Sequence, residues 1–256
     1  MSLPINAFKK GLTARDKMLG VWAMSGSAVV AEALGFCGYD FVVLDMEHAP
    51  NDVPRILALL QAVAGTPAAS VVRLPWNDAV VVKQVLDCGA QTIMFPYIQT
   101  TDDARRAVAA TRYPPDGVRG VAGMSRATRY GSVPDYFRVA AGELCIVVQI
   151  ETAEAVGNLG AIANVDGVDC LFVGPNDLSA SLGRAGQTDH PEVRAALAEA
   201  IRMCADLGKP CGILAANAAR ADEYLEMGYD WVAAGSDLGL LLTTARQNLK
   251  DLRAGS

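Results

Sequence analysis

The stretch FVVLDMEH at residues 41–48 combines the pattern of a buried strand with a group of charged side chains. It begins with a near-continuous apolar run, which is typical of a parallel strand that is covered on both faces. Asp45, Glu47 and His48 stand at the end of this run. Since the active sites of parallel α/β proteins lie at the carboxyl ends of their strands, the stretch predicts both the sheet type and a catalytic position.

Similar apolar runs recur along the chain and alternate with longer segments whose apolar residues lie three and four positions apart. The eight candidate strands are Leu19–Met24, Phe41–Met46, Ser70–Leu74, Thr92–Tyr97, Leu144–Ile150, Cys170–Val173, Gly212–Ala215 and Trp231–Ala234. The candidate helices are Val53–Val63, Val80–Asp87, Asp102–Thr111, Pro191–Leu207 and Ala218–Met227. This order predicts an α/β fold, a single (β/α)8 TIM barrel over residues 1–256, with an open doubly wound sheet as the alternative.

Residues that begin and end helices stand at the expected places. Glycines follow several candidate helices, and short polar side chains precede them. The glycines are Gly65, Gly89, Gly208 and Gly228, and the N-cap candidates are Asn51-Asp52, Asn77-Asp78 and Thr101-Asp102. Only the segment Tyr113–Gly142 has no clean helical or strand pattern. It is either a functional or interface loop or a plain surface excursion.

The composition argues against several classes of protein. The net charge is −6 and no basic patch is dense, so we expect no nucleic-acid partner. No apolar run approaches the roughly 20 residues that cross a bilayer, and residues 1–12 lack the apolar core of a signal peptide. The six cysteines form no C-x-x-C pair, and several lie in apolar runs, as buried thiols do in a reducing compartment. We expect a cytoplasmic protein without a membrane partner.

Two carboxylates are the candidate metal ligands. Glu151 ends one candidate strand, and Asp177 follows the next. Two carboxylates on neighbouring strand ends suit a hard cation such as Mg²⁺ or Mn²⁺, with water or substrate oxygens as the remaining ligands. The alternative for either residue, Asp177 above all, is a helix N-cap.

His48 and Arg73 are the candidate catalytic side chains. The pKa range of histidine suits a general base near neutral pH, and Asp45 or Glu47 could orient His48. His190, by contrast, stands at a helix start and is expected to be structural. Arg73 ends an apolar strand, where its charge requires an anion. That anion is either a substrate carboxylate or developing enolate, or Asp45 or Glu47 in a structural salt bridge.

Five motifs, taken in order, resemble the HpcH/HpaI aldolase family, the metal-dependent 2-oxo acid aldolases. They are DMEHAPN at 45–51, VR at 72–73 followed by WND at 76–78, RYPPDGVRG at 112–120, QIET at 149–152 and GPNDLS at 174–179. The resemblance covers nearly the whole chain, about residues 5–250. It implies an enzyme that forms 4-hydroxy-2-oxo acids from a 2-oxo acid and an aldehyde, or cleaves them into these two products.

The resemblance also implies roles for particular residues. Glu151 and Asp177 would hold a divalent ion (Mg²⁺ or Mn²⁺, with Co²⁺ as a further choice), and His48, paired with Asp45, would move the proton. Arg73 would stabilise the enolate. The residues expected at the substrate are Gln149, Gly174, Pro175 and Asn176 beside the donor, and Trp76 and Leu214 beside the aldehyde.

The resemblance further implies an assembly and leaves the donor open. Members are usually homohexamers with the last helix exchanged between subunits, a contact for the apolar face of Leu238–Leu242. Asn176 stands where the family often has a small residue. Its amide makes hydroxypyruvate a candidate donor beside pyruvate.

Three rival functions remain. A Schiff-base aldolase needs a lysine at a strand end, and none of the six lysines stands there. An acyl-coenzyme A lyase on a related barrel needs a basic docking surface, for which Arg119, Arg126 and Arg129 are the candidates. A non-enzymatic binding protein predicts no metal-dependent turnover.

Overall fold

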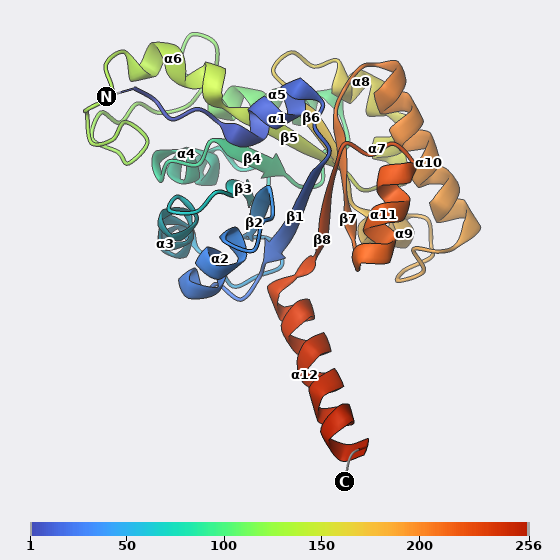
Figure 1. Cartoon of the computed structure of the whole chain (residues 1–256). Coiled ribbons are helices and arrows are strands. Elements are labelled where there is room, and N and C mark those ends of the chain that lie inside the picture. The colour runs from blue at the N-terminus through green and yellow to red at the C-terminus, as the bar shows by residue number, and fades with distance from the viewer. Residues whose placement is uncertain (1, 255–256) are drawn as a thin grey trace.

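The computed structural model describes residues 2–254 and contains a closed barrel of eight strands. All neighbouring strands are parallel and follow one another in chain order, with β8 closing onto β1 (Figure 1). The strands are β1 Met18–Ala23, β2 Phe41–Asp45, β3 Ala69–Arg73, β4 Thr92–Phe95, β5 Cys145–Ile150, β6 Cys170–Val173, β7 Cys211–Ala215 and β8 Trp231–Ser236. The barrel prediction is confirmed, each predicted strand is present, and the open sheet is excluded.

Helices surround the barrel on the outside (Figure 1). They are α1 Ala7–Ala14, α2 Ala28–Gly35, α3 Val53–Val63, α4 Ala79–Asp87, α5 Thr101–Thr111, α6 Tyr136–Glu143, α7 Ala153–Gly157, α8 Leu159–Ala163, α9 Pro175–Ser181, α10 Pro191–Asp206, α11 Ala218–Glu226 and α12 Asp237–Ala254. The last helix, α12, extends away from the rest of the molecule. Within residues 2–254, no helix is both long and apolar enough to span a membrane.

Two local predictions are corrected by the structure. The segment Tyr113–Gly142 is not free of secondary structure, because α6 occupies its end. The sequence gives little sign of this helix, since Asp135 at its N-cap has a left-handed backbone and makes no capping hydrogen bond. At α5 the N-cap is Thr100 rather than Thr101-Asp102, and Thr100 forms a capping box with Asp103.

The other capping predictions have mixed outcomes. Asp52 and Asp78 cap α3 and α4 as expected, and His190 caps α10 by accepting from the backbone N–H of Glu192. Three of the four glycines that follow helices, Gly89, Gly208 and Gly228, have positive φ angles of 92°, 64° and 108°. Gly65 is not among the residues with positive φ, so it does not end α3 in the left-handed conformation.

Alternation along the strands separates an outer core from an inner one. In β2, Val42 and Leu44 pack outward against the helices, whereas Phe41 and Val43 belong to the cluster inside the barrel. Since successive side chains of a strand point to opposite faces, the next inward position is Asp45. By the same alternation Arg73 follows Val71 in β3, and Gln149 and Glu151 follow Val147 in β5. The candidate site residues therefore continue the inner core at the carboxyl end of the barrel.

The amino end of the barrel is closed by aromatic side chains. The ring of Phe8 from α1 lies 5.3 Å from that of Phe41 and 5.1 Å from that of Trp231, measured between centroids. A Cβ atom on Gly212 would lie 2.1 Å from the Trp231 ring, so the indole can fill the barrel only because this position is glycine. A substrate therefore has access to the inner residues only from the carboxyl end.

Candidate active site

A cavity of about 800 Å³ opens at the carboxyl end of the barrel. The predicted site residues that line it are His48, Arg73, Gln149, Glu151, Gly174, Pro175, Asn176, Asp177 and Leu214. Asp45 lies beneath this surface, fully buried against Arg73. Trp76 is not part of the lining: it is 55% exposed and stacks on Tyr97, with 5.6 Å between ring centroids.

Glu151 is a buried carboxylate that is fixed from two sides. One oxygen accepts a hydrogen bond of 2.6 Å from the backbone N–H of Tyr97, and the other accepts one of 2.8 Å from the side-chain amide of Gln149. Gly174 leaves space for this carboxylate, because a Cβ atom there would lie 2.6 Å from a Glu151 carboxylate oxygen. Strand β5 and the turns after β4 and β6 thus determine the orientation of the carboxylate.

The electrostatics around Glu151 favour a cation. Burial raises the pKa of Glu151 to about 7, against the opposing hydrogen bond from Tyr97, and the negative charges of Glu47 and Asp177 contribute to the rise. Asp177 lies in the first turn of α9 but does not cap it. The amide oxygen of Gln149 is buried and accepts no hydrogen bond. Carboxylates that repel each other beside an unsatisfied amide oxygen form a donor set that suits a hard cation.

The protein groups alone would not complete such a coordination sphere. Over residues 2–254, no group of three or more histidine, cysteine, aspartate or glutamate side chains is arranged to hold a metal ion. Mg²⁺ in proteins is commonly held by one or two carboxylates, with water and substrate oxygens as the other ligands. Glu151 and Asp177 fit that pattern, whereas a closed structural zinc site would require four protein ligands.

Arg73 is held rigidly by two carboxylates and a ring. Its Nε and Nη2 atoms donate to the two oxygens of Asp45, each at 2.7 Å, and its Nη1 lies 3.0 Å from an oxygen of Glu47. The guanidinium carbon lies 4.2 Å from the centroid of the Trp22 ring. A guanidinium has five N–H groups, so these contacts leave N–H groups for a substrate oxygen. The structural salt bridge and a substrate contact are therefore compatible.

His48 lies beside Glu47, one of the two carboxylates expected to orient it. Both oxygens of Asp45 are engaged by Arg73, so Asp45 is not the partner of His48. The nearest carboxylate is that of Glu47, with 4.0 Å between its oxygen and Nε2 of His48. Burial raises the pKa of Glu47, while the charges of Arg73 and His48 oppose the rise. The His48 side chain is 56% exposed, so it can reach a bound substrate.

Among the lining residues that were not predicted are two aromatic side chains and an arginine. Trp22 and Phe172 form an aromatic wall, with 6.1 Å between ring centroids, and Arg220 lies at the start of α11. Strand alternation was the available signal for Trp22 and Phe172, because both belong to the inner cluster. Nothing local distinguishes Arg220 from any charged residue of a solvent-facing helix.

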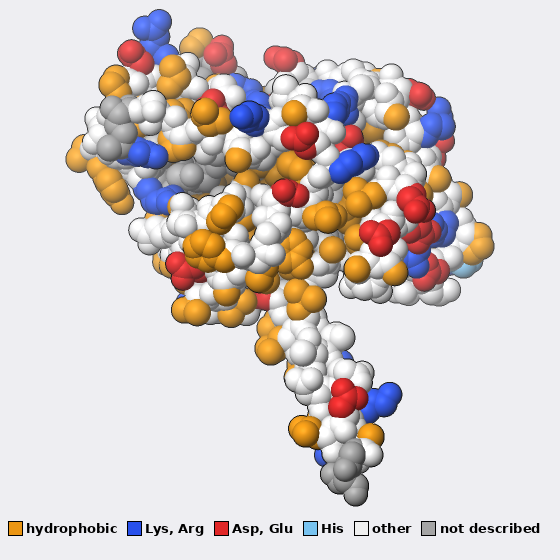
Figure 2. All heavy atoms as spheres, viewed as in Figure 1, with side chains coloured by type: hydrophobic (Ala, Val, Ile, Leu, Met, Phe, Trp, Pro, Cys, Tyr) orange, Lys and Arg blue, Asp and Glu red, His pale blue; other side chains and the backbone are white. Residues whose placement is uncertain are grey.

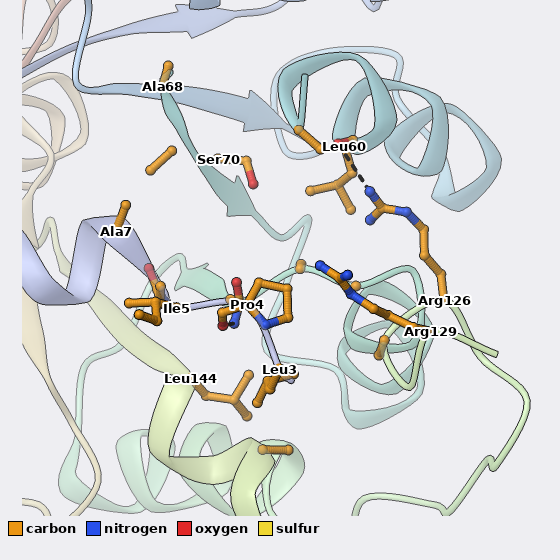
Figure 3. A pocket seen from close by; sticks show the side chains of 18 of the residues that line it. Leu3, Pro4, Ile5, Ala7, Leu60, Ala68, Ser70, Arg126, Arg129 and Leu144 are labelled. Carbon is orange, nitrogen blue, oxygen red and sulfur yellow. Dashed lines mark hydrogen bonds between the residues drawn. The ribbon is translucent and has the colours of Figure 1, made fainter. Parts of the chain in front are cut away.

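A second cavity, of about 520 Å³, lies at the other end of the barrel (Figure 3). It is bordered by the segment 3–7, the start of β3 and the arginines Arg126 and Arg129. Arg126 donates to the carbonyl oxygens of Cys88 and Leu60, at 2.8 and 3.4 Å. In the described part of the chain, neither a carboxylate nor a histidine lines this cavity. Its described residues therefore offer no carboxylate ligand for a metal ion and no histidine base, unlike those of the cavity at the carboxyl end.

Known proteins resemble this chain over most of its length. Residues 18–244 match the model of the HpcH/HpaI aldolase/citrate lyase family. A hydroxypyruvate/pyruvate aldolase of Sagittula stellata is 47% identical over 245 residues, 96% of this chain and 97% of that protein. A 4-hydroxy-2-oxo-heptane-1,7-dioate aldolase of Salmonella paratyphi A is 50% identical over 237 residues, 92% of this chain and 90% of that protein.

A solved structure has the same fold as this chain. An HpcH/HpaI aldolase/citrate lyase family protein from Burkholderia cenocepacia J2315 superposes with a TM-score of 0.95 at 43% identity. The superposition covers 97% of this chain and 99% of that one. The shared structure thus includes the whole eight-stranded barrel.

Proposed function

Because the chain belongs to the HpcH/HpaI aldolase/citrate lyase family and is an aldolase, we propose that it forms and cleaves 4-hydroxy-2-oxo acids with a divalent cation held by Glu151 and Asp177. The observation that carries this proposal is the buried Glu151 carboxylate, whose pKa is raised to about 7 beside Asp177. When bound, a divalent cation supplies Lewis acidity that polarises the 2-oxo group of the donor.

The chain's own residues bind the donor and stabilise the charge that develops on it. Gln149 and the turn Gly174–Asn176 line the cavity beside the carboxylates and would enclose a three-carbon 2-oxo acid. Arg73 directs its remaining N–H groups at the oxygen that becomes negative when the donor loses a proton. Asp45, Glu47 and Trp22 keep the guanidinium in place, so little reorganisation is needed during the reaction.

His48 is the group proposed to move the proton. In the forward direction it would take a proton from the donor's methyl group and give it to the oxygen of the aldehyde as the new C–C bond forms. In the cleavage direction it would take the proton from the 4-hydroxyl group and give it to C3 of the donor after the C–C bond breaks. An oxygen of Glu47 lies 4.0 Å from Nε2 of His48 and is the nearest carboxylate oxygen to the imidazole. Asn176 lines the cavity beside these groups, and its amide could bind the hydroxyl of hydroxypyruvate, so both pyruvate and hydroxypyruvate are proposed donors.

We propose that the cation is Mg²⁺ or Mn²⁺, with Co²⁺ as a further candidate. Oxygen ligands suit the two hard ions, and the cavity lining includes no cysteine in the described part of the chain. Glu151 and Asp177 would hold any of these three ions, so their order of affinity is to be measured by titrating each ion into the metal-free protein.

The exposed leucines of α12 support an assembly, proposed as a homohexamer with exchanged last helices. Leu238, Leu240, Leu241 and Leu242 are 42–63% exposed, and Figure 2 shows hydrophobic side chains along this projecting helix. Apolar side chains that stay exposed on a projecting helix are typical of a subunit contact. Size-exclusion chromatography with light scattering, with and without residues 238–254, tests it.

The rival functions fit the site less well. A Schiff-base mechanism has no candidate, because no lysine lines the cavity in residues 2–254. The arginines considered for coenzyme A are committed elsewhere: Arg119 is buried and paired with Asp87 at 3.0 Å, and Arg126 lies at the other end of the barrel. A purely binding role is not what the family comparison supports.

The direct test is removal and return of the cation. The purified protein is treated with EDTA and then given Mn²⁺ or Mg²⁺, while pyruvate release from a 4-hydroxy-2-oxo acid is followed with lactate dehydrogenase. We expect release to stop after chelation and to return with the ion. Equal release with and without the chelator would contradict the proposal, and a covalent adduct trapped by borohydride and pyruvate would support the lysine mechanism instead.

The role of His48 is tested separately. Proton exchange at the pyruvate methyl group is followed by NMR in D₂O, together with Mn²⁺ binding. We expect His48→Ala to slow exchange by about 10²-fold and to leave Mn²⁺ binding intact, since general bases contribute about 10²–10⁴-fold. Unchanged exchange would remove His48 from this role.

A further inference from the structure

Tyr97 contributes a backbone group to the proposed metal site from outside the cavity. It follows β4, and its backbone N–H donates a hydrogen bond of 2.6 Å to a carboxylate oxygen of Glu151. Its side chain is 41% exposed and is not part of the cavity lining. Gln149 donates to the other oxygen of the same carboxylate at 2.8 Å. The orientation of Glu151 therefore depends in part on a residue whose side chain lies outside the cavity.

The backbone of Tyr97 has a conformation that a bulky side chain disfavours. Its φ angle is 55°, in the left-handed region that residues other than glycine rarely adopt. Such a conformation persists only where the surrounding structure holds it, and it is often found at functional sites. Pro96 and Ile98 on either side are buried, and the N–H of Ile98 donates to the carbonyl oxygen of Gln149 at 3.3 Å. The left-handed turn thus directs one N–H at Glu151 while both neighbours stay in the interior.

The ring of Tyr97 packs on the ring of Trp76. The two rings are stacked, with 5.6 Å between their centroids and 29° between their planes. Trp76 lies between β3 and α4, in a loop that is fixed by its next two residues. The side-chain amide of Asn77 donates to the carbonyl oxygen of Asp103 in α5 at 3.0 Å, and Asp78 caps α4. A ring on a fixed loop can restrict the side chain of Tyr97 and, through it, the left-handed backbone.

We propose that the stack of Trp76 on Tyr97 positions the metal ligand Glu151, because it stabilises the left-handed backbone that directs the Tyr97 N–H at the carboxylate. This inference rests on the proposed metal-dependent function and adds two positioning residues to it. Partners that hydrogen-bond to a ligating group fix its orientation, and their loss weakens metal binding by about 10- to 100-fold. The stack therefore contributes to the affinity for the cation.

The experiment measures the Kd of Mn²⁺ by isothermal titration of the EDTA-treated and dialysed full-length protein, without substrate. We expect Trp76→Ala to raise the Kd by about 10-fold, because the ring that restricts Tyr97 is lost. Trp76→Phe keeps a ring for stacking and should stay within about 3-fold of the wild-type Kd. A wild-type Kd in Trp76→Ala would overturn the inference.

Two substitutions of Tyr97 separate the backbone from the ring. Tyr97→Ala removes the stack and keeps a side chain that disfavours the left-handed region, so the Kd should rise by about 10- to 100-fold. Tyr97→Gly also removes the stack, but glycine adopts a positive φ without steric cost and should recover part of that loss. Equal Kd values for these two variants would contradict the role given to the left-handed backbone.

Phe137→Ala is the matched control. Phe137 is 42% exposed and packs on the ring of Tyr113, with 5.2 Å between centroids. It lies in α6, which borders the cavity at the other end of the barrel. We expect it to keep the wild-type Kd, and thermal unfolding of every variant verifies its folding. A comparable rise of the Kd in Phe137→Ala would attribute the effect to a general loosening of the fold and overturn the inference.

A failure of the proposed function would look different. The wild-type protein would then bind no Mn²⁺ and release no pyruvate from a 4-hydroxy-2-oxo acid, and the positioning role would be overturned with it. Mn²⁺-dependent release by the wild-type protein, with an unchanged Kd in Trp76→Ala and Tyr97→Ala, would leave the aldolase function standing. That result would remove only the role of the stack.

Discussion

Two glutamates stand at opposite ends of the same strand, and their surroundings differ. Glu143, before β5, accepts a hydrogen bond of 2.7 Å from the backbone N–H of Asn6 and so ties the N-terminal segment to the barrel. Glu151, after β5, is buried near Asp177 and Glu47, and its pKa is raised to about 7. Both carboxylates accept hydrogen bonds from the protein, but Glu151 is also buried beside negative charges that raise its pKa.

The same contrast extends to the two ends of the barrel. At the amino end Phe8, Phe41 and Trp231 fill the interior, and ion pairs such as Lys9–Asp169, 3.2 Å apart, lie around it. At the carboxyl end the inward positions are charged and open into a cavity. In barrels of this type the amino end contributes stability and the carboxyl end contributes chemistry. Substitutions at the two ends should therefore change different quantities.

The largest effect is expected from Glu151→Gln. The amide keeps the shape but loses the charge that would hold the cation, so we expect kcat/KM to fall by about 10³-fold or more. Glu143→Gln, at the other end of β5, is the control and should keep wild-type kcat/KM. Steady-state kinetics with Mn²⁺ and isothermal titration of the ion provide the measurements. Comparable losses of kcat/KM in Glu151→Gln and Glu143→Gln would contradict the assignment of catalysis to the carboxyl end of the barrel.

Phe8→Ala tests the amino end. The side chain is 1% exposed and packs edge-on against two rings, so its loss leaves a cavity. We expect the free energy of unfolding to fall by about 3–5 kcal/mol. Urea unfolding measures it, with kcat/KM determined well below the unfolding midpoint. A variant with wild-type stability but impaired catalysis would reverse the roles given to the two ends.

The free energy of unfolding should depend on pH through the titration of Glu151. Its pKa is raised from 4.5 to about 7 in the folded protein, so the metal-free folded state binds this proton more tightly than the unfolded chain. The stabilisation is complete below the unfolded pKa and is lost as pH rises from about 4.5 to 7. The loss amounts to at most about 3 kcal/mol.

This loss is measured by urea unfolding of EDTA-treated protein at several pH values. Glu151→Gln should show a flatter profile over this range, while Glu143→Gln should keep the wild-type profile. Added Mn²⁺ should oppose the loss, because the cation competes with the proton for the carboxylate. Identical profiles for the wild-type protein and Glu151→Gln would show that this carboxylate titrates normally.

Arg73→Lys should have the smallest effect of the four. Lysine keeps the charge but cannot bond to both oxygens of Asp45, approach Glu47 and still offer donors to the substrate in one plane. We expect kcat to fall by about 10- to 100-fold, with a smaller change in KM. Arg126→Lys, at the opposite cavity, should lower the melting temperature and keep kcat. A change in KM alone would assign Arg73 to ground-state binding.

Much of the fold could be read from local patterns. Apolar runs covered on both faces gave the eight strands, and Asp52 and Asp78 marked two helix starts correctly. The prediction was wrong at α6, where Asp135 has a left-handed backbone and offers no capping bond. It was also wrong at α5, because Thr101-Asp102 is as good an N-cap by composition as Thr100.

The site was predicted as a set of residues, with Asp45 and Glu47 left as alternative partners for both Arg73 and His48. Strand ends indicated which side chains share the rim of the barrel. They did not indicate that Arg73 would engage both oxygens of Asp45, which leaves Glu47 as the neighbour of His48. Trp76, chosen from its motif, stacks on Tyr97 instead of lining the cavity.

The sequence by itself determined the eight strands, their parallel order and the side chains that end them, because alternation and burial are properties of neighbouring residues along one strand. Only the tertiary structure decided the pairings, the raised pKa of Glu151 and the place of Arg220 in the cavity wall. Those properties depend on groups from different strands and helices, whose distances are fixed only when the barrel closes.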